Sequence, residues 1–394
     1  MSDSPNCPVP AGVNLHLTFT GFRNESRALR EGRSLLSAGF FREVHFVSNL
    51  LDDDQSFESI GPGLQVERVA AHSFRDRAHL KGRLGRILEF AEWTLRVSVG
   101  QRGRPVRVIH CHSLPCLPAS TILHAISGAP IVYDAHELET ERMGWSLPLR
   151  LGAKILEVAC LPAVSTTLVV SESIRTWYRR HRFMRSIHTV RNLPRRPSSL
   201  PRRTGILRRA LGLREADFVC LYQGAMGNGR GINVLLESFA EVRDKHLVFM
   251  GYGPDVDKVL MAASTCANIH YLAAVPPDVL YDYTADADVG LALIEDQCLS
   301  YRYCLPNKLF EYMVCGVPVI ASDLPEMRRS VESLLGGWVV EPTVAKLVPL
   351  LRSIERDGRS LVANGLQERA LSCTWDADAE VLLNAYRDVL RAEE

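Results

Sequence analysis

The residues best suited to chemistry lie in one stretch, residues 305–323. Pro306 suits the first position of a helix, where a missing N–H costs nothing, so a helix is predicted to begin there. The first N–H groups of a helix lack partners within it and its dipole is positive at that end, so this start beside Asn307 and Lys308 predicts an anion site. Glu311, one turn further on, can accept hydrogen bonds from sugar hydroxyls. Phosphate donors beside a hydroxyl acceptor indicate a nucleotide-sugar site.

A glycine-rich turn at residues 224–231 is a second candidate. It holds four glycines and Arg230 in eight positions, which lets the backbone approach a ligand closely beside a cation. In the first half of the chain, His112, His136 and Ser171 each follow an apolar, strand-like segment. Ligands of doubly wound sheets bind at the carboxyl ends of the strands, so these three residues are expected at one edge. A histidine there can donate to a sugar hydroxyl, or to a phosphate when protonated.

Strand-like and helix-like segments alternate along the chain, which predicts an α/β fold with parallel, doubly wound sheets. A basic amphipathic helix is predicted over 79–100, with Ile87 and Leu95 among its inward residues. Asp134 and Ser171 are predicted to cap the segments that follow their strands. In the first half, strands are expected over residues 13–20, 43–49, 64–70, 106–111, 129–133, 167–170 and 187–190.

A segment rich in proline, serine and arginine (residues 195–204, RRPSSLPRRT) divides the sequence, and the α/β pattern restarts after it. We therefore predict two domains, 1–199 and 200–377. Their charges differ: residues 1–203 hold 28 Lys/Arg and 18 Asp/Glu, a balance of +10, whereas the remaining residues hold 18 and 27, a balance of −9. This asymmetry indicates different partners for the two halves.

Composition is that of an ordinary globular protein, with 394 residues of which 46% are hydrophobic and 23% charged. The N-terminus lacks the basic and apolar regions of a signal peptide, and no apolar run is long enough to cross a membrane. The ten cysteines are scattered without a CxxC pair, which predicts reduced thiols in a cytoplasmic protein. Asp52, Asp53 and Asp54 resemble a metal-binding DxD motif, but we interpret them as a solvated turn and predict no metal site.

Several motifs together resemble a known family. They are the GxxxxxRG turn at 224–231, GxGP at 251–254 and NKLFEYMxxGVPVIASD at 307–323, with DAHE, VVSES and VRNLP at 134–137, 169–173 and 190–194. Two tandem doubly wound domains with these motifs resemble the GT-B glycosyltransferases, and most closely the retaining family 4 (group 1 type). The resemblance covers about residues 13–390, and the motif at 307–323 is the most specific.

This resemblance implies two Rossmann-like domains that face a central cleft. Residues 1–199 would form the acceptor-side domain, joined by a final helix at 378–394, and residues 200–377 would bind the nucleotide sugar. The implied reaction is transfer of a sugar from a nucleoside diphosphate to an acceptor hydroxyl. It implies no metal or other cofactor, because the nucleoside-diphosphate sugar is a co-substrate.

The family's functional residues fall on matching positions of this sequence. Arg230 resembles the residue that neutralises the diphosphate, and the N–H groups of Asn307 and Lys308 resemble those that meet the distal phosphate. Glu311 resembles the glutamate that binds the ribose, and His112 the histidine that helps to hold and activate the sugar. The predicted catalytic residues are His112 and His136. The predicted donor-binding residues are Gly224, Arg230, Tyr303, Asn307, Lys308, Leu309 and Glu311.

The sequence departs from the family at two places. Tyr303 stands where a glutamate usually binds the hydroxyls of the donor sugar, and Glu295 and Asp296 are nearby acids that could substitute for it. Ala225 stands where an arginine often follows the first glycine of the turn. The side chain of Lys308 could supply the missing charge.

The leading hypothesis is a retaining glycosyltransferase of cell-surface polysaccharide or glycolipid synthesis, with a lipid-linked or saccharide acceptor. The alternatives are a non-catalytic GT-B partner subunit and another GT-B enzyme, such as a nucleotide-sugar epimerase or an inverting transferase. The basic first half predicts an anionic membrane surface rather than nucleic acid as a partner, because no aromatic-interleaved RNA motif accompanies it. A cytoplasmic protein, peripheral on the inner face of the cell membrane, fits these features, and a solvated basic face is the plain alternative.

Overall fold

The structure, a computed structural model, describes residues 12–23, 25–51, 54–71, 83–355 and 364–392. The chain divides into two compact units, one of Met1–Arg191 with Ala379–Glu394 and one of Asn192–Asp378. The division precedes the predicted linker because the residues just before that linker belong to the second unit. Leu193 is buried in the core of that unit, and the Pro194 carbonyl accepts a 2.8 Å hydrogen bond from the N–H of Trp375.

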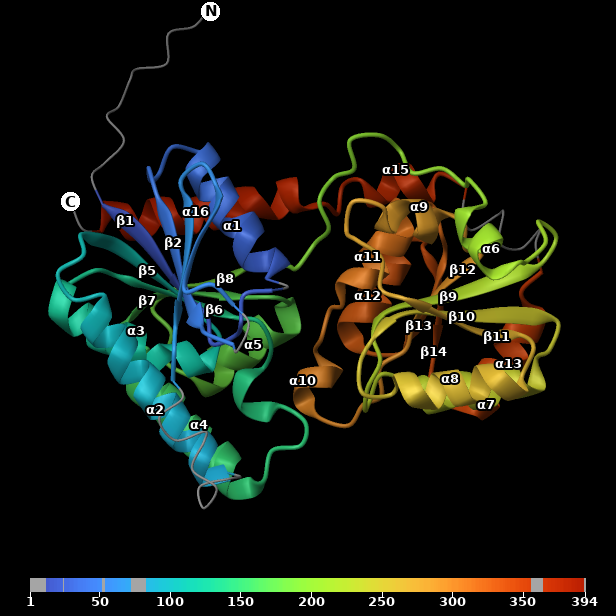
Figure 1. Cartoon of the computed structure of the whole chain (residues 1–394), viewed down its shortest axis with the longest axis horizontal. Helices are drawn as coiled ribbons and strands as arrows, with labels where there is room; N and C mark the ends of the chain where they lie inside the picture. Colours follow the sequence, from blue (N-terminus) through green and yellow to red (C-terminus); the bar gives the residue numbers. More distant parts are fainter. Residues whose placement is uncertain (1–11, 24, 52–53, 72–82, 356–363, 393–394) are drawn as a thin grey trace, which may run out of the picture. The chain divides into compact units, whose positions relative to one another are not determined.

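The described part of the first unit is built on an eight-stranded sheet in the order β3-β4-β2-β1-β5-β6-β7-β8, with helices on both faces (Figure 1). The strands are parallel except β3, which pairs antiparallel with β4. The strands are β1 (Val13–Leu17), β2 (Val44–Asn49), β3 (Phe57–Gly61), β4 (Leu64–Val69), β5 (Val106–His112), β6 (Ile131–Ala135), β7 (Val164–Val169) and β8 (Ile187–Thr189). The helices are α1 (Ser26–Ser37), α2 (Arg83–Gly100), α3 (Leu117–Ser127), α4 (Leu147–Cys160), α5 (Glu172–His181) and, from Ala379 on, α16 (Trp375–Arg391).

Two features of this unit differ from the sequence predictions. The edge strand β3 was not predicted, because it buries no side chain fully and its Phe57 is exposed. In α2, Ile87 and Leu95 are 56% and 63% exposed, so their predicted inward orientation is wrong. The helix instead turns Trp93 and Val97 into the core. The start of the predicted helix, residues 79–82, lies outside the described residues, as do Asp52 and Asp53.

The described part of the second unit is built on a parallel sheet of six strands in the order β11-β10-β9-β12-β13-β14. The strands are β9 (Phe218–Ala225), β10 (Lys245–Tyr252), β11 (Ile269–Ala273), β12 (Val289–Ala292), β13 (Val319–Ser322) and β14 (Gly337–Val340). The helices are α6 (Ile206–Leu211), α7 (Ile232–Glu241), α8 (Val256–Thr265), α9 (Leu280–Ala285), α10 (Leu299–Arg302), α11 (Asn307–Val314), α12 (Pro325–Leu334), α13 (Val344–Ser353) and α15 (Leu366–Ala370).

Strand β9 accounts for the two-sided core of this unit. Its successive side chains point to opposite faces, so Val219 and Leu221 join one apolar cluster while Cys220 and Tyr222 join the other. A strand buried on both faces reads as a continuous apolar run, which is the expected pattern in a parallel sheet covered by helices. The doubly wound fold class predicted from the sequence is therefore present in both units.

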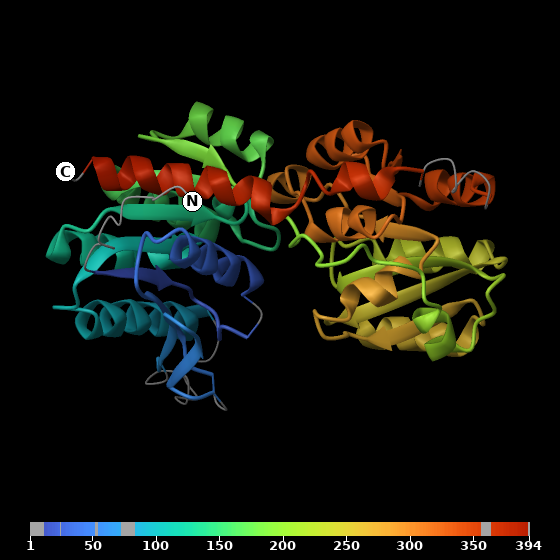
Figure 2. The ribbon, with the colours of Figure 1, turned by 90° about the horizontal axis from the view of Figure 1, so that it is seen from above.

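Helix α16 completes the first unit, along which it runs in Figure 2. Its Tyr386 hydroxyl lies 2.7 Å from Nδ1 of His110, so the end of the chain packs against the centre of the first sheet. The nine cysteines that the structure describes are free thiols. None of the helices in the described ranges is both long enough and apolar enough to span a bilayer.

Candidate active site

The start of α11 forms the first part of the site. Pro306 is the N-cap, with extended backbone, rather than the predicted first residue of the helix, which begins one residue later at Asn307 and Lys308. The Tyr312 hydroxyl fixes this helix to β9, because it accepts from the Gln223 N–H at 2.8 Å and donates to the Leu221 carbonyl at 2.9 Å. Gly290 leaves room for that ring, since a Cβ there would lie 2.3 Å from it.

A cavity of about 330 Å³ lies where α11 begins. Gly224, Asn307, Lys308 and Glu311 of the predicted donor site line it together. Residues that were not predicted complete the lining. These are Gln223, Met250, Gly251, Tyr252, Ala274, Val275, Leu280 and Pro306.

Gln223 is the functional candidate that sequence reasoning missed most plainly. Its Nε2 donates to Oε2 of Glu311 at 2.6 Å, and its Oε1 accepts from the Thr284 hydroxyl at 2.8 Å. This arrangement orients the Glu311 carboxylate at the edge of the cavity. The sequence does contain a signal for it, because Gln223 is a polar residue at the end of an apolar strand, directly before Gly224.

The charge of Lys308 is suppressed in this setting. Its Nζ lies 3.6 Å from the centre of the Tyr222 ring, and Cε is 3.8 Å from where a Cβ at Gly224 would stand. Burial, followed by the nearby Arg230 guanidinium, lowers the pKa of Lys308 to about 7, against a smaller opposing effect of Glu311. An anion beside Nζ would favour the charged form of Lys308 and raise its pKa again.

The other predicted donor residues lie outside this lining. Arg230 stands just before α7 with its guanidinium 5.1 Å from the Tyr301 ring centre, near enough to affect the pKa of Lys308. The Leu309 side chain is fully buried in the core, and its N–H donates to the Pro306 carbonyl at 3.2 Å. Tyr303 follows α10 and is half-buried. Of the nearby acids, Asp296 pairs with Arg302 at 2.6 Å.

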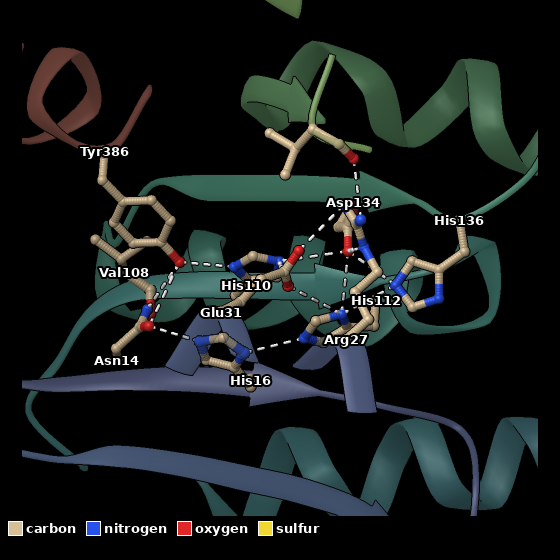
Figure 3. Close-up of polar contacts among 11 residues, drawn as sticks. Asn14, His16, Arg27, Glu31, Val108, His110, His112, Asp134, His136 and Tyr386 are labelled. Atoms are coloured by element: carbon tan, nitrogen blue, oxygen red, sulfur yellow. Dashed lines mark hydrogen bonds and ion pairs between the residues drawn. The ribbon is translucent and has the colours of Figure 1, made fainter. Parts of the chain in front are cut away.

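A second group of polar residues lies at the carboxyl ends of β1, β5 and β6 in the first unit (Figure 3). Nε2 of His112 lies 2.9 Å from Nδ1 of His16, and Nδ1 of His112 lies 3.2 Å from Nε2 of His136. Both ring nitrogens of His112 therefore face other side chains, and this residue is only 2% exposed. His136 keeps a quarter of its side chain exposed, so it is the histidine of this pair that can meet a substrate.

Asp134 holds this group together. Its carboxylate accepts a bidentate pair of hydrogen bonds from Arg27, at 2.8 and 2.7 Å, and lies 2.8 Å from Nε2 of His136. The predicted capping role of Asp134 is therefore wrong, because its side chain serves Arg27 and His136 instead. Ser171, by contrast, caps α5 as predicted, its hydroxyl accepting from the Ile174 N–H.

Charges in this group are set by burial and by Asp134. Burial opposes ionisation of Asp134, but Arg27 and His136 outweigh it and hold the pKa of the carboxyl well below its usual range. Burial also disfavours a charged His136, yet the Asp134 carboxylate raises the pKa of His136. Burial and neighbouring histidines lower the pKa values of His16 and His112, so these two are neutral. The Asp134 carboxylate thus favours the charged form of the partly exposed His136, which lies beside the neutral ring of His112.

Backbone strain accompanies this group. Ser113 directly follows His112 and has φ +66°, a left-handed conformation that is rare outside glycine. Its N–H donates to the Asp134 carbonyl at 2.9 Å. Strained residues held by their surroundings cluster at functional sites, which adds weight to this end of the sheet.

Four buried residues of the group also have the donor types of a metal site. One nitrogen or oxygen of each lies within 4.8 Å of the others, the set being Glu31, His110, His112 and Asp134. The Asp134 carboxylate and the His112 ring already engage Arg27, His16 and His136. An ion would therefore have to displace existing contacts.

One family model matches the chain. Residues 217–354 match the model described as glycosyl transferases group 1, which places the cavity and the start of α11 inside the match. No match was found among curated protein sequences.

Solved structures share the whole fold. Sucrose-phosphate synthase from Thermosynechococcus elongatus has a TM-score of 0.80 at 16% identity, with 97% of this chain and 100% of that chain covered. HepE from Anabaena, solved in complex with UDP and glucose, has 0.73 at 15% identity, covering 96% and 100%. WaaG, a glycosyltransferase involved in lipopolysaccharide biosynthesis, has 0.69 at 16% identity, covering 94% and 99%.

The fold and the cavity together define a GT-B protein with two Rossmann-like units, as predicted. The family match covers residues 217–354, so this part of the second unit is similar to the glycosyl transferases of group 1.

Proposed function

We propose that the protein is a retaining hexosyltransferase of family 4, and that it moves a sugar from a nucleoside-diphosphate sugar to an acceptor hydroxyl in cell-surface polysaccharide or glycolipid synthesis. The cavity at the start of α11 carries this proposal, because it combines helix N–H groups, a suppressed lysine charge and an oriented carboxylate. Phosphate oxygens would meet the first N–H groups and Lys308, and a ribose hydroxyl would meet Glu311.

Catalysis in this proposal rests on electrostatics in the second unit. Cleavage of the sugar–phosphate bond leaves negative charge on the departing diphosphate. Arg230 is a cation near that charge, Lys308 becomes one when it gains a proton on binding, and the α11 start adds aligned N–H groups. The apolar residues Val275 and Leu280 in the same cavity would pack against the base. Because HepE was solved with UDP, uridine nucleotides are the first to test.

His136 is the group we assign to the sugar or its acceptor. Asp134 and Arg27 fix its orientation, and its partial exposure leaves it accessible to hydroxyl or phosphate oxygens. We assign His112, His16 and Asp134 to positioning, since their polar atoms are engaged with one another or with Arg27. We propose no resident metal, because an ion at Asp134 and His112 would break these contacts.

We also propose that the enzyme is cytoplasmic and binds the inner face of the membrane peripherally, where a lipid-linked acceptor resides. In Figure 1, helices α2, α3 and α4 lie together on the first unit. They expose an unusual number of large apolar side chains, which we call the apolar helix face: Ile87, Leu95, Val99, Ile122, Ile126, Leu147, Leu149, Leu151, Ile155 and Val158. Such a face suits the boundary between lipid headgroups and acyl chains, and the partly exposed Arg96 of α2 and Arg150 of α4 would favour anionic lipids.

The experiment that tests this function is incubation of the full chain with a panel of nucleotide sugars. We expect slow hydrolysis of one donor without acceptor, and transfer to saccharide or lipid-linked acceptors with the anomeric configuration of the donor, as read by NMR. An inverted product would exclude the retaining mechanism. Conversion of the donor sugar to its epimer would favour the epimerase alternative, and no turnover or binding of any donor would favour a non-catalytic subunit.

A further inference from the structure

A second polar cavity, of about 350 Å³, lies on the first unit between the C-terminal half of α5 and strand β8. Strand β8 is the last strand of its sheet, and the cavity lies along this edge rather than at the strand ends that hold His136. Four arginines line it, with Ser186 and His188 among the other lining residues. The arginines are Arg175, Arg179, Arg182 and Arg185.

These arginines are only partly neutralised by protein carboxylates. Arg182 donates to Glu157 at 2.9 Å, and Arg175 has a longer contact of 3.4 Å with Glu172. Within the ranges that the structure describes, Arg179 and Arg185 form no ion pair. No carboxylate belongs to the lining. The cavity therefore carries a surplus of positive charge.

Two guanidinium nitrogens are also buried without a hydrogen-bond acceptor in the described residues, namely Nε of Arg175 and Nη2 of Arg182. A buried donor without an acceptor costs free energy, more so on a charged group. A favourable contact with the α5 dipole accounts for a cation such as Arg179 in the last turn of the helix. The helix dipole does not account for Arg185, which lies beyond the helix, or for the buried nitrogens of Arg175 and Arg182 that lack an acceptor.

We propose that this cavity binds a phosphate group, either the headgroup of an anionic lipid or a free phosphate ester. A phosphate dianion offers several acceptor oxygens and matches the fork of a guanidinium in bidentate geometry. It would neutralise Arg179 and Arg185, which have no ion pair in the described part of the chain. The Ser186 hydroxyl and Nε2 of His188, which lie 2.8 Å apart, add neutral polar groups to the wall. This inference is independent of donor binding in the second unit.

The test uses the full chain carrying Arg230→Ala and Lys308→Met. These two substitutions remove the cations of the proposed donor site, so that phosphate binding there does not contribute to the signal. Three proteins with this background are compared. The first has no further change, the second carries both Arg179→Ala and Arg185→Ala, and the third carries Arg180→Ala as a control. Arg180 is exposed on the same helix but does not line the cavity. Circular dichroism and melting curves verify that all three proteins are folded.

Binding of inorganic phosphate and pyrophosphate is measured calorimetrically at low salt. We expect the unaltered cavity and the Arg180→Ala control to bind alike, and the double variant to bind at least about tenfold more weakly, because two charge-assisted contacts are lost. Flotation with vesicles of phosphatidic acid in phosphatidylcholine shows whether the bound phosphate belongs to a lipid headgroup or to a free phosphate ester. Loss of flotation in the double variant, with competition by glycerol phosphate, assigns a lipid headgroup, whereas soluble binding alone assigns a free phosphate ester. Equal behaviour of all three proteins in both assays, or no binding in either, overturns the proposal.

Discussion

Replacing Lys308 by methionine should weaken nucleotide-sugar binding and remove most of its pH dependence. In the free protein the pKa of Lys308 is lowered to about 7, whereas a bound diphosphate would favour the charged form. Binding above pH 7 must therefore recruit a proton. The protonated fraction falls from about nine-tenths at pH 6 to about one-tenth at pH 8, so the Kd of the wild type should rise roughly tenfold over this interval.

The methionine variant should show a nearly flat Kd over the same range, since the diphosphate of a nucleotide sugar stays fully ionised there. At pH 6 it should bind roughly ten- to a hundredfold more weakly than the wild type, which corresponds to one charge-assisted hydrogen bond of about 1.5–3 kcal/mol. Lys346→Met, an exposed lysine of α13, is the matched control and should behave as the wild type. Calorimetric titration with the donor at several pH values provides the measurement.

The same substitution makes a prediction for stability. An unfolded lysine titrates near 10.5 and folded Lys308 near 7, so the folded state binds fewer protons in this window. Stability of the free protein is therefore lowered as pH falls from 10.5 to 7, and the loss persists below pH 7. Methionine removes this cost, so the free variant should melt no lower than the wild type at pH 6. Equal pH slopes of donor affinity in the two proteins would refute the reasoning.

Four further predictions follow from the same geometry. Glu311→Gln should weaken donor binding by about tenfold or more without lowering the melting temperature, because the carboxylate is lost but the amide still fits beside Gln223; unchanged affinity in a binding titration would argue against the ribose contact. His136→Gln should reduce kcat, and wild-type activity should fall as pH rises through the raised pKa of His136, a limb that the variant should lack in a pH–rate profile. Dialysis against a chelator should change neither the activity nor the melting temperature. A loss of activity that a divalent ion restores would contradict the proposal that no metal is bound. Leu151→Asp with Ile155→Asp should abolish flotation with anionic vesicles, and undiminished flotation would exclude the apolar helix face as the membrane contact.

The sequence predicted the fold because its signals are periodic. Alternating apolar strands and amphipathic helices identify a doubly wound sheet wherever both faces are buried, as in β9. Strand β3 gave no such signal, because an exposed edge strand needs no apolar face. The inward face of α2 was misjudged for a related reason. The helix carries apolar side chains on more than one side, and periodicity alone does not say which side meets the core.

The candidate site was predictable where it is local in sequence. Asn307, Lys308 and Glu311 share one helix, so their spacing alone places them together. The partners of Asp134 and His112 could not be predicted in this way, because Arg27 and His16 reach them across the sheet from distant segments. The prediction that Leu309 binds the donor also came from its place within the motif, and the sequence alone did not show that its side chain belongs to the core.

Binding of a nucleotide sugar at the start of α11 underlies the proposed function of the second unit. Hydrogen–deuterium exchange of the full chain, with and without each nucleotide sugar of the panel, tests it most directly. We expect one donor to protect residues 223–231, 274–280 and 305–314, and Glu311→Gln to diminish this protection. Protection that lies elsewhere in the second unit, or none with any donor, would contradict it.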